Sequence, residues 1–132
     1  MPDSLYIVLI RIHKRYGSDV PIFVTENGWS THAGIEDDFR VNYYRAALKG
    51  ALDAIDKGVN LMGYIAWSLM DNYEWMQGYI ERFGLYEVDF EDPARPRTPR
   101  KSAFIYKQII KTRMIDNNYE PDNYVMTIDE GH

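Results

Sequence analysis

The sequence contains no cysteine, so a disulfide framework and a thiolate metal site are both excluded. Its three histidines, His13, His32 and His132, lack the spacing of a metal site or of a catalytic triad. A glycine-rich phosphate loop is absent as well, which argues against a nucleotide site. We therefore expect a protein that binds no metal and needs no cofactor.

Basic charge is also scarce, because 15 Lys and Arg stand against 20 Asp and Glu and leave a net charge of −5. Phosphate groups need a basic face, so nucleic acid and membrane surfaces are disfavoured as partners. No apolar run reaches membrane-spanning length, and residues 1–4 lack the basic and apolar regions of a signal peptide. If Met1 is the true start we expect a cytosolic protein, whereas a longer parent protein leaves secretion open.

The spacing of apolar residues predicts three helices. The first runs from a candidate N-cap at Ser4 to a stop at Gly17. The second is capped by Asp37 or Asp38 and stops at Gly58, and Ser102 is the candidate N-cap of the third. The buried faces that we expect are Leu5, Leu9, Ile12 and Tyr16, then Tyr44, Leu48, Ala51 and Ile55, then Ile105, Ile109 and Ile110.

Two apolar runs, at residues 22–25 and 61–67, predict buried strands. Neither run alternates regularly with polar residues, which is typical of parallel strands that are covered on both faces. A helix separates the two runs, so we expect an α/β fold in which parallel strands are joined by a helical crossover. Two such strands alone do not make a stable sheet. The chain therefore has the pattern of an arc cut from a larger barrel.

The remaining segments connect or follow these elements. Residues 83–90 favour a short surface strand, and the Pro- and Arg-rich residues 92–101 predict a loop. We expect Asp71 and Asn72 to brace the preceding loop and Arg82 to pair with an acid that the sequence does not identify. Beyond Met114 the chain turns polar and acidic, which predicts a poorly ordered tail. This gives a partial barrel over residues 1–113 and a disordered tail over residues 114–132.

Glu26 lies where the first predicted strand ends, just before the turn signal Asn27-Gly28. The carboxyl ends of parallel strands are where α/β folds and (β/α)8 barrels keep their chemistry. From the strand and the turn alone, a solvated acid before a helix is the simpler interpretation of Glu26. A second motif changes this balance.

Residues 24–28 (VTENG) and 67–75 (WSLMDNYEW), followed by residues 82–85 (RFGL), occur at a matching separation. With these motifs the chain resembles the C-terminal part of a family 1 glycoside hydrolase. This is the β-glucosidase family that includes lactase-like and myrosinase-like animal enzymes. The resemblance runs from about Asp3 to about Lys111. It implies the C-terminal portion of a TIM (β/α)8 barrel, from helix six through strand seven, helix seven and strand eight to helix eight, which is incomplete as an isolated chain.

The resemblance also implies roles for individual residues. Glu26 carries over as the catalytic nucleophile of a retaining β-glycosidase that hydrolyses O-glycosidic bonds in a small β-glycoside or oligosaccharide. Glu74 carries over as the acid that binds sugar hydroxyls, and Trp67, Trp75 and Phe83 as further substrate-binding residues. The alternatives are a surface acid for Glu74 and plain core packing for the three aromatic residues.

The acid/base of this family sits in an Asn-Glu-Pro motif, which this sequence does not contain. We therefore expect the isolated chain to be inactive. One interpretation is a fragment of a β-glucosidase-like enzyme that supplies the nucleophile half of the site, with the missing N-terminal barrel portion as its partner. The others are a truncated carbohydrate-binding pseudoenzyme without catalysis and a structural barrel remnant. The preferred glycone and aglycone stay open.

Overall fold

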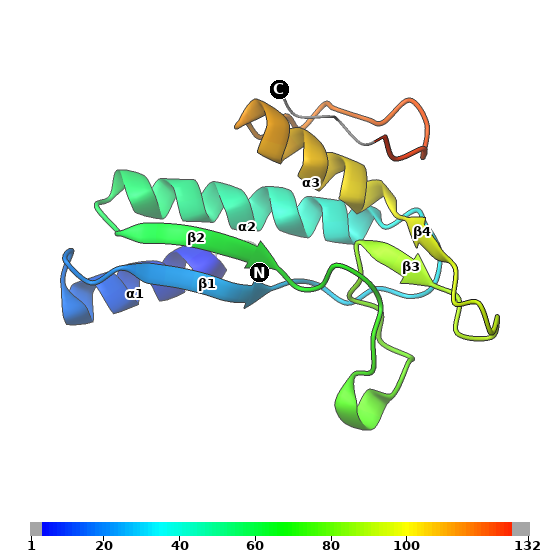
Figure 1. The fold of residues 1–132 in the computed structure, drawn as a ribbon. Helices are drawn as coiled ribbons and strands as arrows, with labels where there is room; N and C mark the ends of the chain where they lie inside the picture. The colour runs from blue at the N-terminus through cyan, green and yellow to red at the C-terminus, as the bar shows by residue number, and fades with distance from the viewer. Residues whose placement is uncertain (1–3, 128–132) are drawn as a thin grey trace.

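The computed structural model describes residues 4–127 of the chain. Figure 1 shows β1 and β2 side by side, with α2 along them and α3 beyond α2. A second pair of strands, β3 and β4, lies past the carboxyl ends of the first pair. In chain order the elements are α1 (Ser4–Tyr16), β1 (Ile22–Asn27), α2 (Asp38–Asp56), β2 (Leu61–Ala66), the 3-10 turn η1 (Trp75–Gln77), β3 (Tyr86–Val88), β4 (Arg97–Pro99) and α3 (Lys101–Thr112).

The strands β1 and β2 pair in parallel, with Ile22 opposite Leu61 and Asn27 opposite Ala66. Parallel neighbours need a long crossover, and α2 supplies it between them. Both strands therefore end at the same edge of the sheet. The structure confirms the predicted α/β arrangement of parallel strands joined by a helix.

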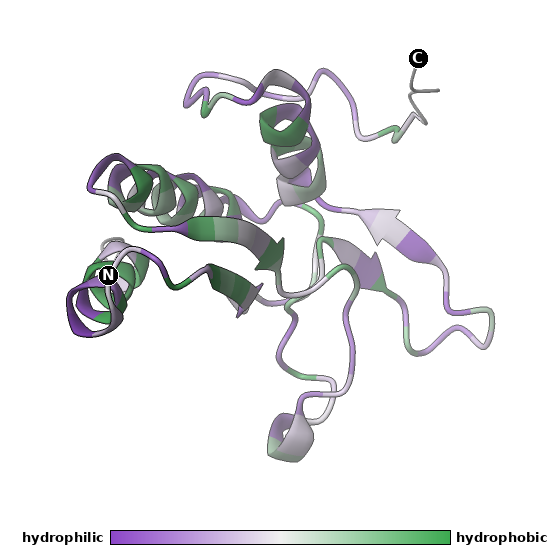
Figure 2. Cartoon of the chain, turned by 60° about the vertical axis from the view of Figure 1, so that its left-hand side comes forward, coloured by the Kyte–Doolittle hydropathy of each residue, from purple (hydrophilic) through white to green (hydrophobic). Residues whose placement is uncertain are grey.

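The core lies between the helices and one face of this sheet. Leu9 of α1 packs with Ala51 and Ala54 of α2, against the sheet residues Ile22 and Val24. A second cluster joins α2 to α3 and the chain before β3 through Tyr44, Ala103 and Leu85. Figure 2 shows the same pattern, with hydrophobic colour along β1 and β2 and on parts of the adjacent helices.

The other face of the sheet is left uncovered by residues 4–127. Phe23 and Met62 are each 60% exposed and Ile65 is 58% exposed, while their neighbours along the strands are half-buried. The two-sided cover that the apolar pattern indicates is therefore not supplied by residues 4–127, as expected for two strands of a larger barrel. The apolar run of each strand nevertheless supplies residues for two covered faces, so the sequence carries more apolar surface than the described chain buries.

The predicted helix ends are partly confirmed. Gly17 and Gly58 follow α1 and α2 with φ of 88° and 92°, a conformation that glycine adopts without strain. The predicted cap at Ser102 is wrong, because α3 begins at Lys101 after an N-cap at Arg100. The buried faces are shifted as well, since three residues predicted as buried are exposed: Tyr16 at 60%, Ile55 at 43% and Ile110 at 56%.

The segment predicted as a loop at residues 92–101 contains β4, which pairs antiparallel with β3. The strand expected at residues 83–90 is confirmed in its central part as β3, but it does not lie at the surface, since Val88 is buried. After α3 the chain returns along the helix, where Tyr124 stacks on Phe104 at a ring distance of 5.5 Å. These contacts describe residues up to 127, and the boundary at residue 113 with a disordered tail stays a prediction, whose last five residues lie outside the described part.

Among residues 4–127, no helix combines the length and the apolar character needed to cross a membrane.

Candidate functional site

The carboxyl ends of β1 and β2 form the centre of the candidate site. Glu26 is the penultimate residue of β1 and is exposed. The next residue, Asn27, accepts a backbone hydrogen bond at 2.7 Å from the amide of Trp67, the first residue after β2. The strand pairing therefore brings Glu26 and Trp67 to one edge of the sheet, as the two sequence motifs predict.

Glycine is required at the turn after Glu26 because the chain approaches Trp67 closely there. A Cβ on Gly28 would lie 1.7 Å from the carbonyl oxygen of Trp67. No side chain fits in this space without moving the backbone of one of the two strand ends. The VTENG motif thus ends in glycine for reasons of packing as well as of turn conformation.

Two tyrosine hydroxyls hold the strand ends. Tyr64 donates to Oδ1 of Asn27 at 2.7 Å, and Tyr44 donates to the carbonyl oxygen of Trp67 at 3.2 Å. Burial raises the pKa of both hydroxyls well above the usual value. Both tyrosines therefore stay protonated donors at neutral pH, and they hold the side chain of Asn27 and the backbone of Trp67 beside Glu26.

The loop after β2 carries Glu74. The indole Nε1 of Trp67 donates to Oε1 of Glu74 at 3.3 Å, so the end of β2 and this acid are in direct contact. The peptide bond between Trp67 and Ser68 is cis. The amide of Glu74 also donates to the carbonyl oxygen of Gly78 at 2.7 Å, which closes the turn around η1.

The structure places the two remaining predicted residues differently. Trp75 is 83% exposed at the start of η1 and contributes no core packing to this chain. Phe83 is half-buried, and its carbonyl oxygen accepts from the amide of Ser68 at 3.0 Å. The structure thus brings Glu26, Trp67 and Glu74 to one end of the sheet and leaves Trp75 projecting from the loop.

The sequence motifs did not predict a cluster of buried charges next to this site. Arg40, Arg100, Asp37 and Asp71 are each 3% exposed or less. Arg40 pairs with Asp37 at 2.6 Å, and Arg100 pairs with Asp71 at 2.8 Å. Arg82 lies 3.5 Å from Asp71, which identifies the acid that the sequence left open. Asp71 therefore braces the loop, as expected, and does so through a buried ion pair.

Burial lowers the pKa of Arg40, and the nearby carboxylate of Asp37 counteracts this effect. Arg40 also donates to the carbonyl oxygen of Trp29 at 3.0 Å and to that of Gly84 at 2.7 Å. It thereby connects the loop after β1 to the loop after β2. A buried arginine in the first turn of a helix gives no sequence signal, because Arg is normally a surface residue.

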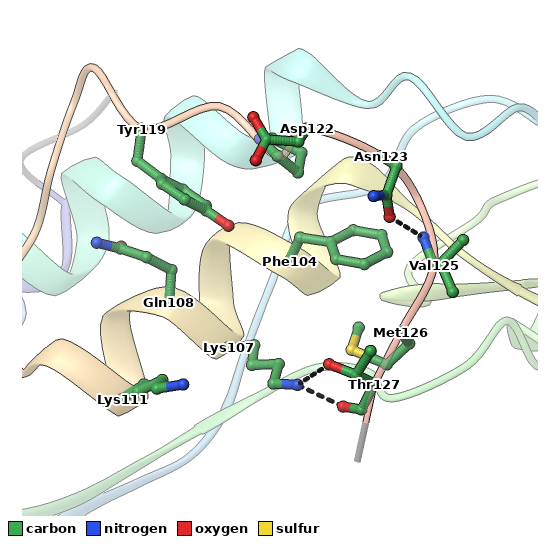
Figure 3. A pocket seen from close by; sticks show the side chains of 11 residues that line it. Phe104, Lys107, Gln108, Lys111, Tyr119, Asp122, Asn123, Val125, Met126 and Thr127 are labelled. Atoms are coloured by element: carbon green, nitrogen blue, oxygen red, sulfur yellow. Dashed lines mark hydrogen bonds between the residues drawn. The ribbon is translucent and has the colours of Figure 1, made fainter. Parts of the chain in front are cut away.

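No cluster of metal-binding side chains occurs within residues 4–127. A pocket of about 400 Å³ lies between α3 and residues 119–127, and Figure 3 shows Phe104, Tyr119 and Gln108 around it. Lys107 donates to the hydroxyl and carbonyl oxygens of Thr127 at its rim. None of the predicted site residues lines this pocket, so it is separate from the strand ends.

Comparison with known proteins identifies the family. The model of glycosyl hydrolase family 1 matches residues 1–115. Lactase/phlorizin hydrolase from Homo sapiens is 48% identical over 101 residues, which cover 75% of this chain and 5% of that protein. Cytosolic beta-glucosidase from Homo sapiens is 44% identical over 124 residues, which cover 86% of this chain and 26% of that protein.

Among solved structures, the family 1 β-glucosidase from Thermotoga maritima superimposes with a TM-score of 0.82 at 31% identity. The match covers 88% of this chain and 27% of that structure. The chain thus spans about a quarter or less of the length of these relatives. On this evidence the chain belongs to glycosyl hydrolase family 1.

Proposed function

We propose that this chain supplies the nucleophile half of a retaining β-glycosidase site, as the C-terminal portion of a (β/α)8 barrel. In this assignment α1 is helix six, β1 strand seven, α2 helix seven, β2 strand eight and α3 helix eight. The observation that carries the proposal is the exposed Glu26 at the end of β1, beside Trp67 and its hydrogen bond to Glu74. The uncovered face of the sheet supports the barrel assignment, because it becomes the interior when the remaining strands close the barrel.

In a retaining mechanism Glu26, as the ionised carboxylate, attacks the anomeric carbon and forms a glycosyl ester. A second carboxyl group, roughly 5 Å away, first protonates the leaving oxygen and then activates water. The bond to the leaving oxygen breaks as the ester forms, and water later releases the sugar from Glu26. Exposure of Glu26 at the sheet edge supports this role, since a nucleophile needs an open approach.

The other predicted residues hold the sugar in this proposal. Glu74 accepts hydrogen bonds from two adjacent hydroxyls of the glycone, and charge assistance strengthens them. Trp67 orients Glu74 through Nε1, and Trp75 and Phe83 supply apolar faces for the ring. A structural relative from Thermotoga maritima is described in complex with deoxynojirimycin, which is consistent with a small-molecule sugar ligand for this fold.

The second carboxyl group has no candidate in this chain, because the sequence contains no Asn-Glu-Pro. We infer that the acid/base comes from the part of the barrel that the chain does not cover. A complete barrel that contains this chain, in one polypeptide or with the remaining strands added, is called the assembled enzyme below. Loss of a positioned acid/base costs about 10²- to 10⁴-fold in rate, so the 132-residue chain alone is expected to be inactive.

The deciding experiment measures hydrolysis of an aryl β-glucoside by the assembled enzyme and by the 132-residue chain in parallel. We expect turnover only in the assembled enzyme and its loss in Glu26→Gln. If the chain alone turns over substrate and Glu26→Gln abolishes this turnover, the proposal that the acid/base lies outside the chain is refuted. Full activity of Glu26→Gln in the assembled enzyme would refute Glu26 as the nucleophile.

A second candidate is carbohydrate binding without catalysis. The observation that favours it is the contact between Trp67 and Glu74, which the chain forms without the remaining barrel. Titration of the chain with glucose or cellobiose, followed by tryptophan fluorescence, separates the two functions. Saturable binding by the chain, lost in Glu74→Ala, together with no turnover by any assembled form, would favour this second candidate.

A further inference from the structure

The loop that carries Glu74 begins and ends at one buried cluster. Asp71 stands at its start and Gly84 just after its end, and the amide of Gly84 donates to Oδ1 of Asp71 at 2.9 Å. The amide of Asp71 in turn donates to the carbonyl oxygen of Tyr86 at 3.0 Å. Residues 72–83 therefore form a loop whose two ends are joined by hydrogen bonds.

The carboxylate of Asp71 is fully engaged in this tie. Arg100 donates to its two oxygens at 2.8 and 2.9 Å, and the amide of Val88 donates to Oδ2 at 3.3 Å. Asp71 is 3% exposed and Arg100 is fully buried. Two-point contact with a planar guanidinium fixes both the position and the orientation of the carboxylate.

The carbonyl oxygen of Gly84 is clamped from two sides. Nη1 of Arg100 and Nη1 of Arg40 each donate to it at 2.7 Å. A Cβ on Gly84 would lie 2.2 Å from the amide nitrogen of Asp71, so only glycine fits here. The end of the loop is thereby held as firmly as its start.

Within the loop, Glu74 follows Asp71 by three residues and is itself only partly buried. Its side chain is held by the hydrogen bond from Trp67, which comes from the strand end rather than from the loop. The position of Glu74 relative to the strand ends therefore depends on two sets of contacts. One is the hydrogen bond from Trp67, and the other is the set of bonds that holds the loop at Asp71 and Gly84.

We propose that Asp71, together with Arg100 and Gly84, is a positioning residue that holds Glu74 in register with Glu26 for recognition of the glycone. This inference rests on the proposed role of Glu74 in sugar binding. It adds a function for a buried ion pair that touches neither the sugar nor the nucleophile. A displacement of about 1 Å at a recognition group costs on the order of 10²-fold in rate. Contacts that fix the ends of this loop are therefore expected to raise kcat/KM.

The test is a double-variant cycle on kcat/KM for an aryl β-glucoside in the assembled enzyme. Asp71→Asn keeps the shape of the side chain and removes its charge. We expect it to lower kcat/KM by about 10- to 100-fold, mainly through KM. In the Glu74→Ala background the same change should cost no more than about twofold, because the group that it positions is gone.

Asp37→Asn is the matched control. Asp37 is as buried as Asp71 and pairs with Arg40 at 2.6 Å. Its other partner is Ser102 in α3, whose amide donates to Oδ1 at 2.9 Å and whose hydroxyl donates to Oδ2 at 2.5 Å. Arg40 also donates to the carbonyl oxygens of Trp29 and Gly84, and we expect these two bonds to persist in the variant. We expect a lower Tm for both Asn variants and a changed kcat/KM for Asp71→Asn alone.

Full additivity of Asp71→Asn and Glu74→Ala would overturn the inference, as would an equal kinetic loss in Asp37→Asn. If Asp71→Asn does not fold, Arg100→Lys replaces it, because lysine keeps the charge and loses the two-point contact. The proposed function fails in a different way, through an unchanged kcat/KM in Glu74→Ala or an active Glu26→Gln. Those two variants are measured without any change at Asp71.

Discussion

Two pairs of acids near the ends of β1 and β2 differ in what their oxygens contact. Glu26 is exposed and Glu74 is partly exposed, with one hydrogen bond from Trp67. Asp37 and Asp71 are 3% exposed, and each is paired with a buried arginine. Acids of the first pair have oxygens that are open to a ligand, whereas the oxygens of the second pair accept hydrogen bonds from other groups of the protein. The difference predicts direct kinetic effects for the first pair. For the second pair it predicts a loss of stability at both positions, with a kinetic effect only at Asp71, which holds the loop of Glu74.

The largest expected effect is in Glu26→Ala. In the assembled enzyme we expect kcat/KM to fall by roughly 10⁴-fold or more, because the glycosyl ester cannot form. Added azide should restore part of the turnover by attacking from the face that the carboxylate vacated. The matched control is Glu91→Ala, which removes another exposed acid. A small loss in Glu26→Ala, or no rescue by azide, would contradict the assignment of the nucleophile.

The next largest effect is in Arg100→Met, which removes the two-point partner of the buried Asp71 and leaves only the longer contact with Arg82, at 3.5 Å. Removing one partner of a buried pair costs about 3–5 kcal/mol of unfolding free energy. Urea unfolding of the assembled enzyme measures this loss. The double variant Asp71→Leu with Arg100→Met should recover part of it, since no lone charge remains. A loss below about 1 kcal/mol in the single variant would show that water reaches this site.

The order of elements was predictable because it rests on local patterns. Apolar spacing located the three helices, and the glycines at positions 17 and 58 marked two of their ends. The covering of the sheet was not predictable from this chain. Phe23, Met62 and Ile65 have the side chains of core residues, yet the elements that would cover them are not among residues 4–127.

The motifs predicted which strand ends meet, and the parallel pairing confirms that Asn27 and Trp67 lie in contact there. They gave no sign that Arg40 and Arg100 are buried beside this edge. Burial of an arginine depends on partners far apart in the chain, such as Asp71 and Gly84 for Arg100. Local composition does not encode such contacts, so the cluster had to come from the fold.

A smaller effect is expected for Glu74→Ala. Loss of charge-assisted hydrogen bonds to the glycone should lower kcat/KM of the assembled enzyme by about 10- to 100-fold. The loss should appear for both aryl β-glucosides and aryl β-galactosides, because in its proposed role the carboxylate binds more than one hydroxyl. Tm should stay within a few degrees of the parent, since Glu74 is only partly buried. An unchanged kcat/KM for both sugars would refute the glycone role.

The smallest effect is expected for Lys49→Ala on the outer side of α2. Lys49 contacts Asp53 one turn later at 2.6 Å, a distance similar to that of the buried pairs. Both side chains are exposed, at 64% and 45%, so water and salt screen the pair. We expect a loss of about 0.3–0.5 kcal/mol in urea unfolding, which disappears in high salt. Comparing this loss with that of Arg100→Met shows how much more a buried arginine with several hydrogen bonds contributes than an exposed ion pair of similar length. A loss in Lys49→Ala as large as that in Arg100→Met would mean that burial does not separate the two kinds of acid.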